Sequence, residues 1–153
     1  MKAEHINCVI SSVLGVLSQA LGAEATKEGV YVKKDDSNGS HLSAVIEVTG
    51  DHKGAFIISL SEDDAKRMAS VLLMEEKNFL DSDVMDAMGE IINMISGGAK
   101  AALVKLGLNF KLTPPVFILG KGTKLFRSVS YVPYIGVSFT SDVGNFSVEV
   151  SLK

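Results

Sequence analysis

Two carboxylates and an amide lie at helical spacing in the middle of the chain: Asp86, Glu90 and Asn93, followed by Gly97. In an α-helix, positions i, i+4, i+7 and i+11 fall in one narrow stripe. We therefore expect an amphipathic helix over 81–105 whose polar stripe points away from the core. The side opposite the stripe is apolar and consists of Met85, Met88, Ile91, Ile92, Ile95, Ala99, Ala102, Leu103 and Leu106.

The amide is the most useful group in this stripe. An asparagine side chain is a poor acid or base, but it offers a donor and an acceptor at fixed separation and can hold a water molecule. Phosphoryl transfer depends mainly on positioning and charge stabilisation, so a water-orienting amide suits it. Glu90 could anchor a lysine of a partner. Spacing alone also fits an ordinary solvated helix face, because Glu-x-x-Asn arises by chance in many helices.

Other chemistries find little support in the residues. Asp86 and Glu90 lie on one helix face and cannot flank a sugar from opposite sides, as glycosidases require; the chain also has no tryptophan. No Gly-x-Ser-x-Gly elbow of a serine hydrolase occurs. His5, His41 and His52 show no ligand spacing, so no metal site is expected.

Composition sets broad limits on the function. A length of 153 residues suits a single domain, and the 46% hydrophobic and 22% charged residues are ordinary for a globular one. A net charge of -3 argues against nucleic acid as a partner. Cys8 is the single cysteine, so no disulfide can form within the chain, and we expect a cytoplasmic protein. No apolar run approaches the ~20 residues of a membrane span, and no signal peptide is recognisable.

The chain is organised as two similar halves. The first has a helix over 4–21 with Gly22 as its stop, strands over 29–34, 42–49 and 55–60, and a short helix from the N-cap Ser61 to about Met74. The second has the 81–105 helix, then strands over 116–119, 128–132, 135–140 and 146–152. This pattern predicts an α+β fold: one domain over 1–153, made of two pseudo-repeated halves, with an antiparallel sheet packed with two long helices.

Two details bear on contacts with other molecules. Gly97 and Gly98 each cost roughly 1 kcal/mol inside a helix, which indicates a close backbone approach to a neighbouring strand or to a partner. The strand over 146–152 alternates apolar and polar residues, which predicts one buried face and one that is wet or covered by a partner. Because this strand is the last, we expect it to offer an edge for pairing with a second copy.

The run from Asp86 to Ala99 resembles the signature of the CheC/CheX/FliY family of chemotaxis phosphatases. That signature has an acidic residue or serine, then the glutamate and asparagine at the spacing of Glu90 and Asn93, and a proline farther on, here Pro115 or its neighbour Pro114. The first helix has no Glu-x-x-Asn, and a single motif is typical of the CheX branch. The two-half organisation and the length match the family over the whole chain.

The resemblance implies a phosphatase that hydrolyses the aspartyl phosphate of a CheY-like response-regulator receiver. In that case Asn93 orients the attacking water, Glu90 anchors the receiver lysine, and Asp86 lies at the flank of the contact. Gly97 either leaves room for the receiver or serves helix–sheet packing within the chain. Mg²⁺ is expected on the receiver and no cofactor on this chain, and a homodimer is expected. The alternatives are a receiver-binding or scaffold module of the same fold without catalysis, and a structural dimerisation domain.

Overall fold

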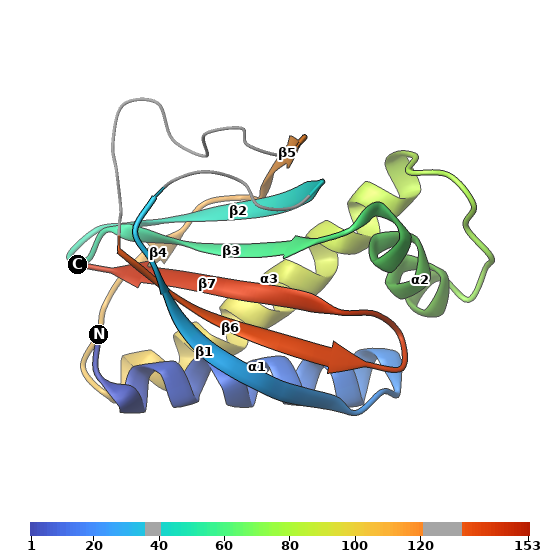
Figure 1. The fold of residues 1–153 in the computed structure, drawn as a ribbon. Helices are drawn as coiled ribbons and strands as arrows, with labels where there is room; N and C mark the ends of the chain where they lie inside the picture. The colour runs from blue at the N-terminus through green and yellow to red at the C-terminus, as the bar shows by residue number, and fades with distance from the viewer. Residues whose placement is uncertain (36–40, 121–132) are drawn as a thin grey trace.

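Helices and strands follow each other along the chain in two runs of similar order. The computed structural model describes residues 1–35, 41–120 and 133–153 (Figure 1). Its elements are α1 (Ala3–Leu21), β1 (Ala25–Lys33), β2 (Leu42–Thr49), β3 (Gly54–Leu60), α2 (Glu62–Leu73), α3 (Ser82–Lys105), β4 (Lys111–Leu112), β5 (Val116–Leu119), β6 (Tyr134–Ser141) and β7 (Phe146–Leu152). The strand expected over 128–132 lies outside the described residues.

The helix ends follow the local signals of the sequence. Gly22 takes the left-handed conformation that ends α1, with φ 61°. The hydroxyl of Ser61 accepts a 3.1 Å hydrogen bond from the backbone N–H of Asp64 at the start of α2. At the start of α3, the carboxylate of Asp81 accepts a 3.0 Å bond from the N–H of Val84. The N-cap predicted at Ser61 and the stop predicted at Gly22 are therefore confirmed.

The seven strands of the described residues form one antiparallel sheet in the order β1-β6-β7-β3-β2-β4, with β5 also pairing with β2. The last strand, β7, lies between β3 and β6 and is hydrogen-bonded on both sides. The expectation that the last strand offers a free edge was therefore wrong. The outer strands of the described sheet are β1 on one side and β4 and β5 on the other.

The two halves exchange strands across the sheet. Each half contributes an antiparallel hairpin, β2–β3 or β6–β7, and these meet where β3 pairs with β7. β1 of the first half completes the hairpin of the second half by pairing with β6. In return, β4 and β5 of the second half pair with β2 of the first. The two predicted halves are thus present but interlocked.

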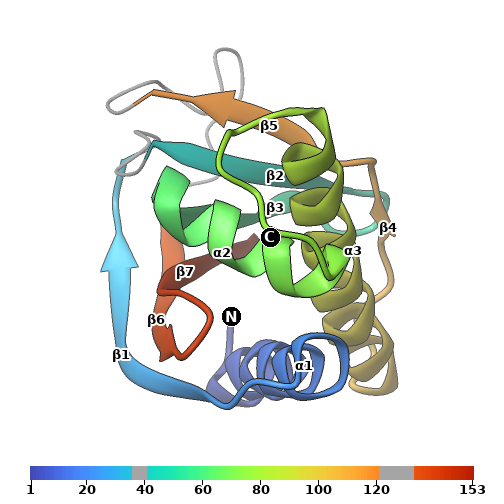
Figure 2. The same ribbon diagram turned by 90° about the vertical axis from the view of Figure 1, so that its right-hand side faces the viewer.

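All three helices pack on one face of the sheet, as Figures 1 and 2 show. The core between them combines inward-facing side chains of β2, β3, β6 and β7 with the apolar sides of α1, α2 and α3. The α+β prediction, with an antiparallel sheet and two long helices, is confirmed; α2 is a third, shorter helix. The fully buried members of the core include Val13, Leu17, Ile46, Phe56, Ile58, Met88, Ile91, Ile92, Ile95 and Val148.

The other face of the sheet carries a buried ion pair. Glu149 on β7 is only 5% exposed. Its carboxylate accepts hydrogen bonds from the hydroxyl of Tyr31 at 2.9 Å and the ammonium of Lys33 at 3.0 Å. Both partners come from β1, where Tyr31 lies opposite Gly136 of β6 and Lys33 opposite Tyr134. The polar face of the last strand is therefore covered at Glu149 by the chain itself, and neither water nor a partner is needed there.

None of the helices in the described part of the chain combines the length and the apolar character needed to cross a membrane.

Candidate functional site

The stripe predicted on the central helix faces solvent. Asp86, Glu90, Asn93 and Gly97 are all exposed along α3. The stripe extends for about 16 Å, since each helical residue rises 1.5 Å. The residues on its opposite side anchor the helix in the core: Met88, Ile91, Ile92, Ile95, Ala99 and Leu103 are fully buried. Exposed polar groups therefore stand on a helix that the core holds rigidly.

Ion pairs between the preceding loop and the first turn fix the start of this helix. The Lys77 ammonium lies 2.8 Å from the Asp81 carboxylate and 3.6 Å from that of Asp83. The hydrogen bond from Lys77 holds the pKa of the Asp81 carboxyl below its usual range, and the N–H of Val84 acts in the same direction. The same bond raises the pKa of Lys77. The loop between α2 and α3 is thus tied to the first turn of α3.

Glu90 and Asn93 are available to another molecule. Within residues 1–35, 41–120 and 133–153, neither side chain makes a hydrogen bond or an ion pair. Residues three apart on a helix have Cβ atoms about 5–6 Å apart, so one ligand can touch both side chains. Asp86 is one turn before Glu90 and is also exposed. The stripe thus presents two carboxylates and an amide with nothing on the described chain competing for them.

The two adjacent glycines have different surroundings. A Cβ placed on Gly97 would meet nothing within 4 Å, so packing inside the described chain does not require this glycine. A Cβ on Gly98 would overlap the hydroxyl of Ser12 on α1. Among the described residues, the helix–sheet packing considered for Gly97 is therefore absent. The close approach predicted from the glycine pair is made by Gly98, and its neighbour is a helix.

Gly89, immediately before Glu90, is a buried glycine of α3 whose role the residue pattern did not predict. A Cβ there would lie 3.4 Å from Cζ of Phe117 and 3.6 Å from Cγ of Pro115. Pro115 directly precedes β5, so this strand end packs against the helix beside the stripe. A buried glycine inside a helix is a signal of close packing, but its neighbour cannot be named from sequence.

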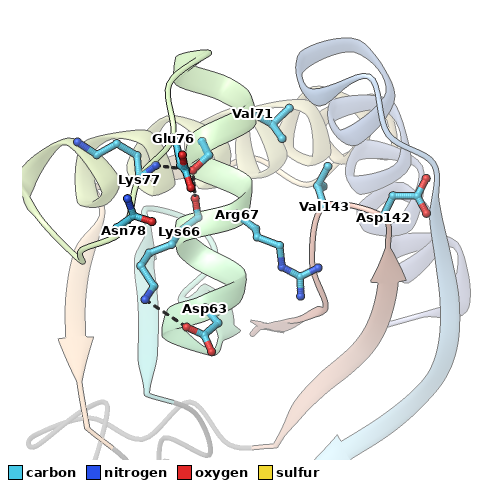
Figure 3. Close-up of a pocket in the computed structure, with 10 residues that line it drawn as sticks. Asp63, Lys66, Arg67, Val71, Glu76, Lys77, Asn78, Asp142 and Val143 are labelled. Atoms are coloured by element: carbon cyan, nitrogen blue, oxygen red, sulfur yellow. Dashed lines mark hydrogen bonds and ion pairs between the residues drawn. The ribbon is translucent and has the colours of Figure 1, made fainter.

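An open groove of about 640 Å³ lies elsewhere, between α2, the loop after it and the turn between β6 and β7 (Figure 3). No residue of the stripe lines it. Its three basic side chains are paired within the chain: Lys66 with Asp63 at 3.2 Å, Arg67 with Asp64 at 3.3 Å and Lys77 with Asp81. Its positive charge is already neutralised, so the groove makes a weak site for an anionic ligand.

The described residues contain no cluster of three or more histidine, cysteine or carboxylate side chains arranged to hold a metal ion. The stripe is convex because it lies along a helix, so it cannot enclose a small substrate. It can insert an amide and a carboxylate into a cleft of another protein. The arrangement thus suits action on a macromolecule whose own site completes the chemistry.

Known proteins share both the sequence and the fold. A model of the family described as chemotaxis phosphatase CheX matches residues 42–140, which include all of α3. The CheY-P phosphatase CheX of Thermotoga maritima is 29% identical over 154 residues, covering 100% of this chain and 98% of the relative.

Solved structures agree with this assignment. The chemotaxis protein CheX of Desulfovibrio desulfuricans is 31% identical, with a TM-score of 0.85, over 98% of this chain and 99% of that one. A CheX–CheY–BeF₃–Mg²⁺ complex from Borrelia burgdorferi contains a chain of the same fold, 24% identical, with a TM-score of 0.74 over 99% of both chains. The family match covers strands of the sheet as well as α3, which carries Glu90 and Asn93. The chain therefore belongs to the CheX family of chemotaxis phosphatases.

Proposed function

We propose that this protein hydrolyses the aspartyl phosphate of a CheY-like receiver domain. The observation that carries the proposal is the exposure of Glu90 and Asn93, one turn apart and without partners among the described residues, on the best-anchored helix of a CheX-family chain. The name of the Thermotoga relative, a CheY-P phosphatase, supports the same substrate. The Borrelia relative forms a complex with CheY.

In the proposed reaction, the Asn93 amide orients a water molecule toward the phosphorus atom. The water oxygen forms a bond to phosphorus while the bond from phosphorus to the receiver carboxylate oxygen breaks. Inorganic phosphate leaves, the aspartate is restored, and the water proton passes to phosphate or solvent. The amide is neither acid nor base, so its contribution is position and orientation.

The other members of the stripe serve binding. Glu90 pairs with a lysine of the receiver, and this holds the helix in register over the phosphate. Asp86 contacts the edge of the receiver, and Gly97 leaves room for its approach. Mg²⁺ is expected on the receiver, where it neutralises phosphate charge. Asp86 and Glu90 make this part of the stripe acidic, which complements a basic residue beside a phosphorylated aspartate.

The test uses purified CheY-like receivers from the same organism, phosphorylated with acetyl phosphate. Decay of the phosphoryl group is followed by phosphate release, with and without the protein. We expect the protein to accelerate the decay. Asn93→Ala should reduce this acceleration about 10–100-fold because the water is no longer oriented. Asn109→Ala, at an exposed asparagine outside the stripe, is the matched control. Binding of a receiver with unchanged decay would support the scaffold alternative. If the protein neither binds a receiver nor accelerates its decay, the structural dimerisation domain is the remaining alternative.

We also propose a homodimer. Since β7 is paired on both sides, a second copy that extends the sheet would pair with an outer strand. β1 pairs on one side with β6, and its Val30 and Val32 are 53% and 55% exposed. On the opposite side β5 exposes Val116 and Leu119. Light scattering after size exclusion measures the mass, and a monomer at micromolar concentration would contradict the proposal.

A further inference from the structure

Helix α1 touches α3 at the turn that follows Asn93. The hydroxyl of Ser12 donates a 2.7 Å hydrogen bond to the backbone carbonyl of Ile95. Gly98 faces the same hydroxyl, and a side chain there would displace it. A glycine at this position is therefore what permits the bond between the two helices.

A second serine acts on the same turn from within α3. The buried hydroxyl of Ser96 donates to the carbonyl of Ile92 at 2.8 Å and to that of Asn93 at 3.3 Å. Bonds from serine to backbone carbonyls alter the local path of a helix. The carbonyls of residues 92, 93 and 95 thus all accept side-chain hydroxyls, so the backbone around Asn93 is bonded from two directions.

This matters because the Asn93 side chain has no partner of its own among the described residues. Its direction depends on the backbone that carries it, since helix geometry restricts the side-chain rotamer. A displacement of about 1 Å at a reacting group can cost on the order of 100-fold in rate. The bonds at residues 92–95 are therefore placed to determine where the amide stands.

We propose that Ser12 is a positioning residue for Asn93: with Gly98, it seats α3 against α1 and fixes the turn carrying the amide. The inference rests on the proposed phosphatase function. It also gives the first half of the chain a role. In α1, Cys8, Ser11 and Gly15 repeat the spacing of Glu90, Asn93 and Gly97 without the reactive groups. The helix without the motif supports the helix that has it.

The test compares Ser12→Ala with Ser11→Ala, an exposed serine on the same helix. Circular dichroism and thermal unfolding first establish that both fold. We expect kcat on the phosphorylated receiver to fall about 3–10-fold in Ser12→Ala with KM nearly unchanged, while Ser11→Ala resembles the parent. In an Asn93→Ala background, Ser12→Ala should cause no further loss. An equal loss in that background, or a change confined to KM, would overturn the positioning role.

Two further measurements separate this inference from the function on which it rests. Gly98→Ala should lower kcat to the same extent, with no additional loss when combined with Ser12→Ala, because both changes remove one hydrogen bond. The ¹³C carbonyl shift of Ile95 should move in both variants. If Asn93→Ala leaves hydrolysis intact, the proposed function fails and this inference with it. If Asn93→Ala is inactive while Ser12→Ala has full kcat, only this inference fails.

Discussion

The hydroxyl of Tyr31 reaches across a neighbouring strand to bond Glu149, 2.9 Å away and two strands distant in the sheet. The strand between them contributes Gly136, and a Cβ there would overlap the Tyr31 ring. The missing side chain thus lets the ring lie over β6. Burial raises the pKa of Tyr31 to about 12, with the neighbouring Glu149 charge acting in the same direction.

That raised pKa predicts a loss of stability in alkali. Below pH 10 Tyr31 is protonated in both folded and unfolded chains; above it the unfolded chain releases the proton first. The free energy of unfolding should therefore fall between about pH 10 and pH 12, by of the order of 1–2 kcal/mol after allowance for solvent screening. Absorbance at 295 nm should show that Tyr31 titrates late. Tyr31→Phe should remove one tyrosine from the late part of the titration and flatten the fall; a late amplitude equal to that of the parent would contradict the assignment.

Glu90 should act through its charge. Replacing it by glutamine keeps the size but removes attraction to a receiver lysine, so KM should rise about 3–10-fold while kcat changes little. The parent KM should increase with salt more steeply than that of Glu90→Gln, because salt screens the pair. Steady-state assays at several salt concentrations measure both. Glu24→Gln, an exposed glutamate before β1, is the control. Parallel salt curves for parent and Glu90→Gln would refute the pairing.

Gly97 should show opposite effects on stability and on binding. Its surroundings are open, so Gly97→Ala should stabilise the helix by up to about 1 kcal/mol. Gly97→Leu should also fold, yet its side chain would occupy the space of an approaching receiver and raise KM by about tenfold or more. Thermal unfolding and receiver titration test the two claims. Tight binding by the leucine variant would exclude a clearance role.

Asp81 should stabilise the start of α3 in a pH-dependent way. Asp81→Ala removes the cap on Val84 and the pair with Lys77, so Tm should fall at neutral pH. The folded pKa of Asp81 is lower than its unfolded value of 3.8, so the stabilisation is present above that value. It is lost as the pH falls through the folded pKa. The Tm difference between parent and variant should narrow in acid, and a constant difference down to pH 2 would rule out the carboxylate as its source.

The sequence allowed the helices and their exposed stripe to be predicted because those features depend on local spacing. Capping at Gly22, Ser61 and Asp81, and the alternation of β7, are likewise local. Strand order is not local. The last strand became central because β3 and β6 pair with it from both halves, and no pattern within 146–152 distinguishes a central strand from an edge. The assignment of Glu90 and Asn93 came from the motif, since spacing alone equally fits a solvated face.

Features that depend on distant contacts could not be predicted in the same way. Glu149 was predicted to lie on a face that is wet or covered by a partner, because it alternates with apolar residues, yet Tyr31 and Lys33 cover it from the other half of the chain. The glycine pair indicated a close approach, but only the structure assigns it to Gly98 and names Ser12 as the neighbour. In each case the missing information is which segments meet after folding.

The exchange of β1 for β4 and β5 makes the two halves dependent on each other. A fragment cut in the loop between α2 and α3 would leave the second half without the outer strand of its hairpin and the first without the strands that border β2. Many of the sheet's pairings join residues far apart in sequence, and folding must close long loops before gaining them. The protein should therefore fold slowly and in one cooperative step, and its motif helix could not be transplanted as an independent module.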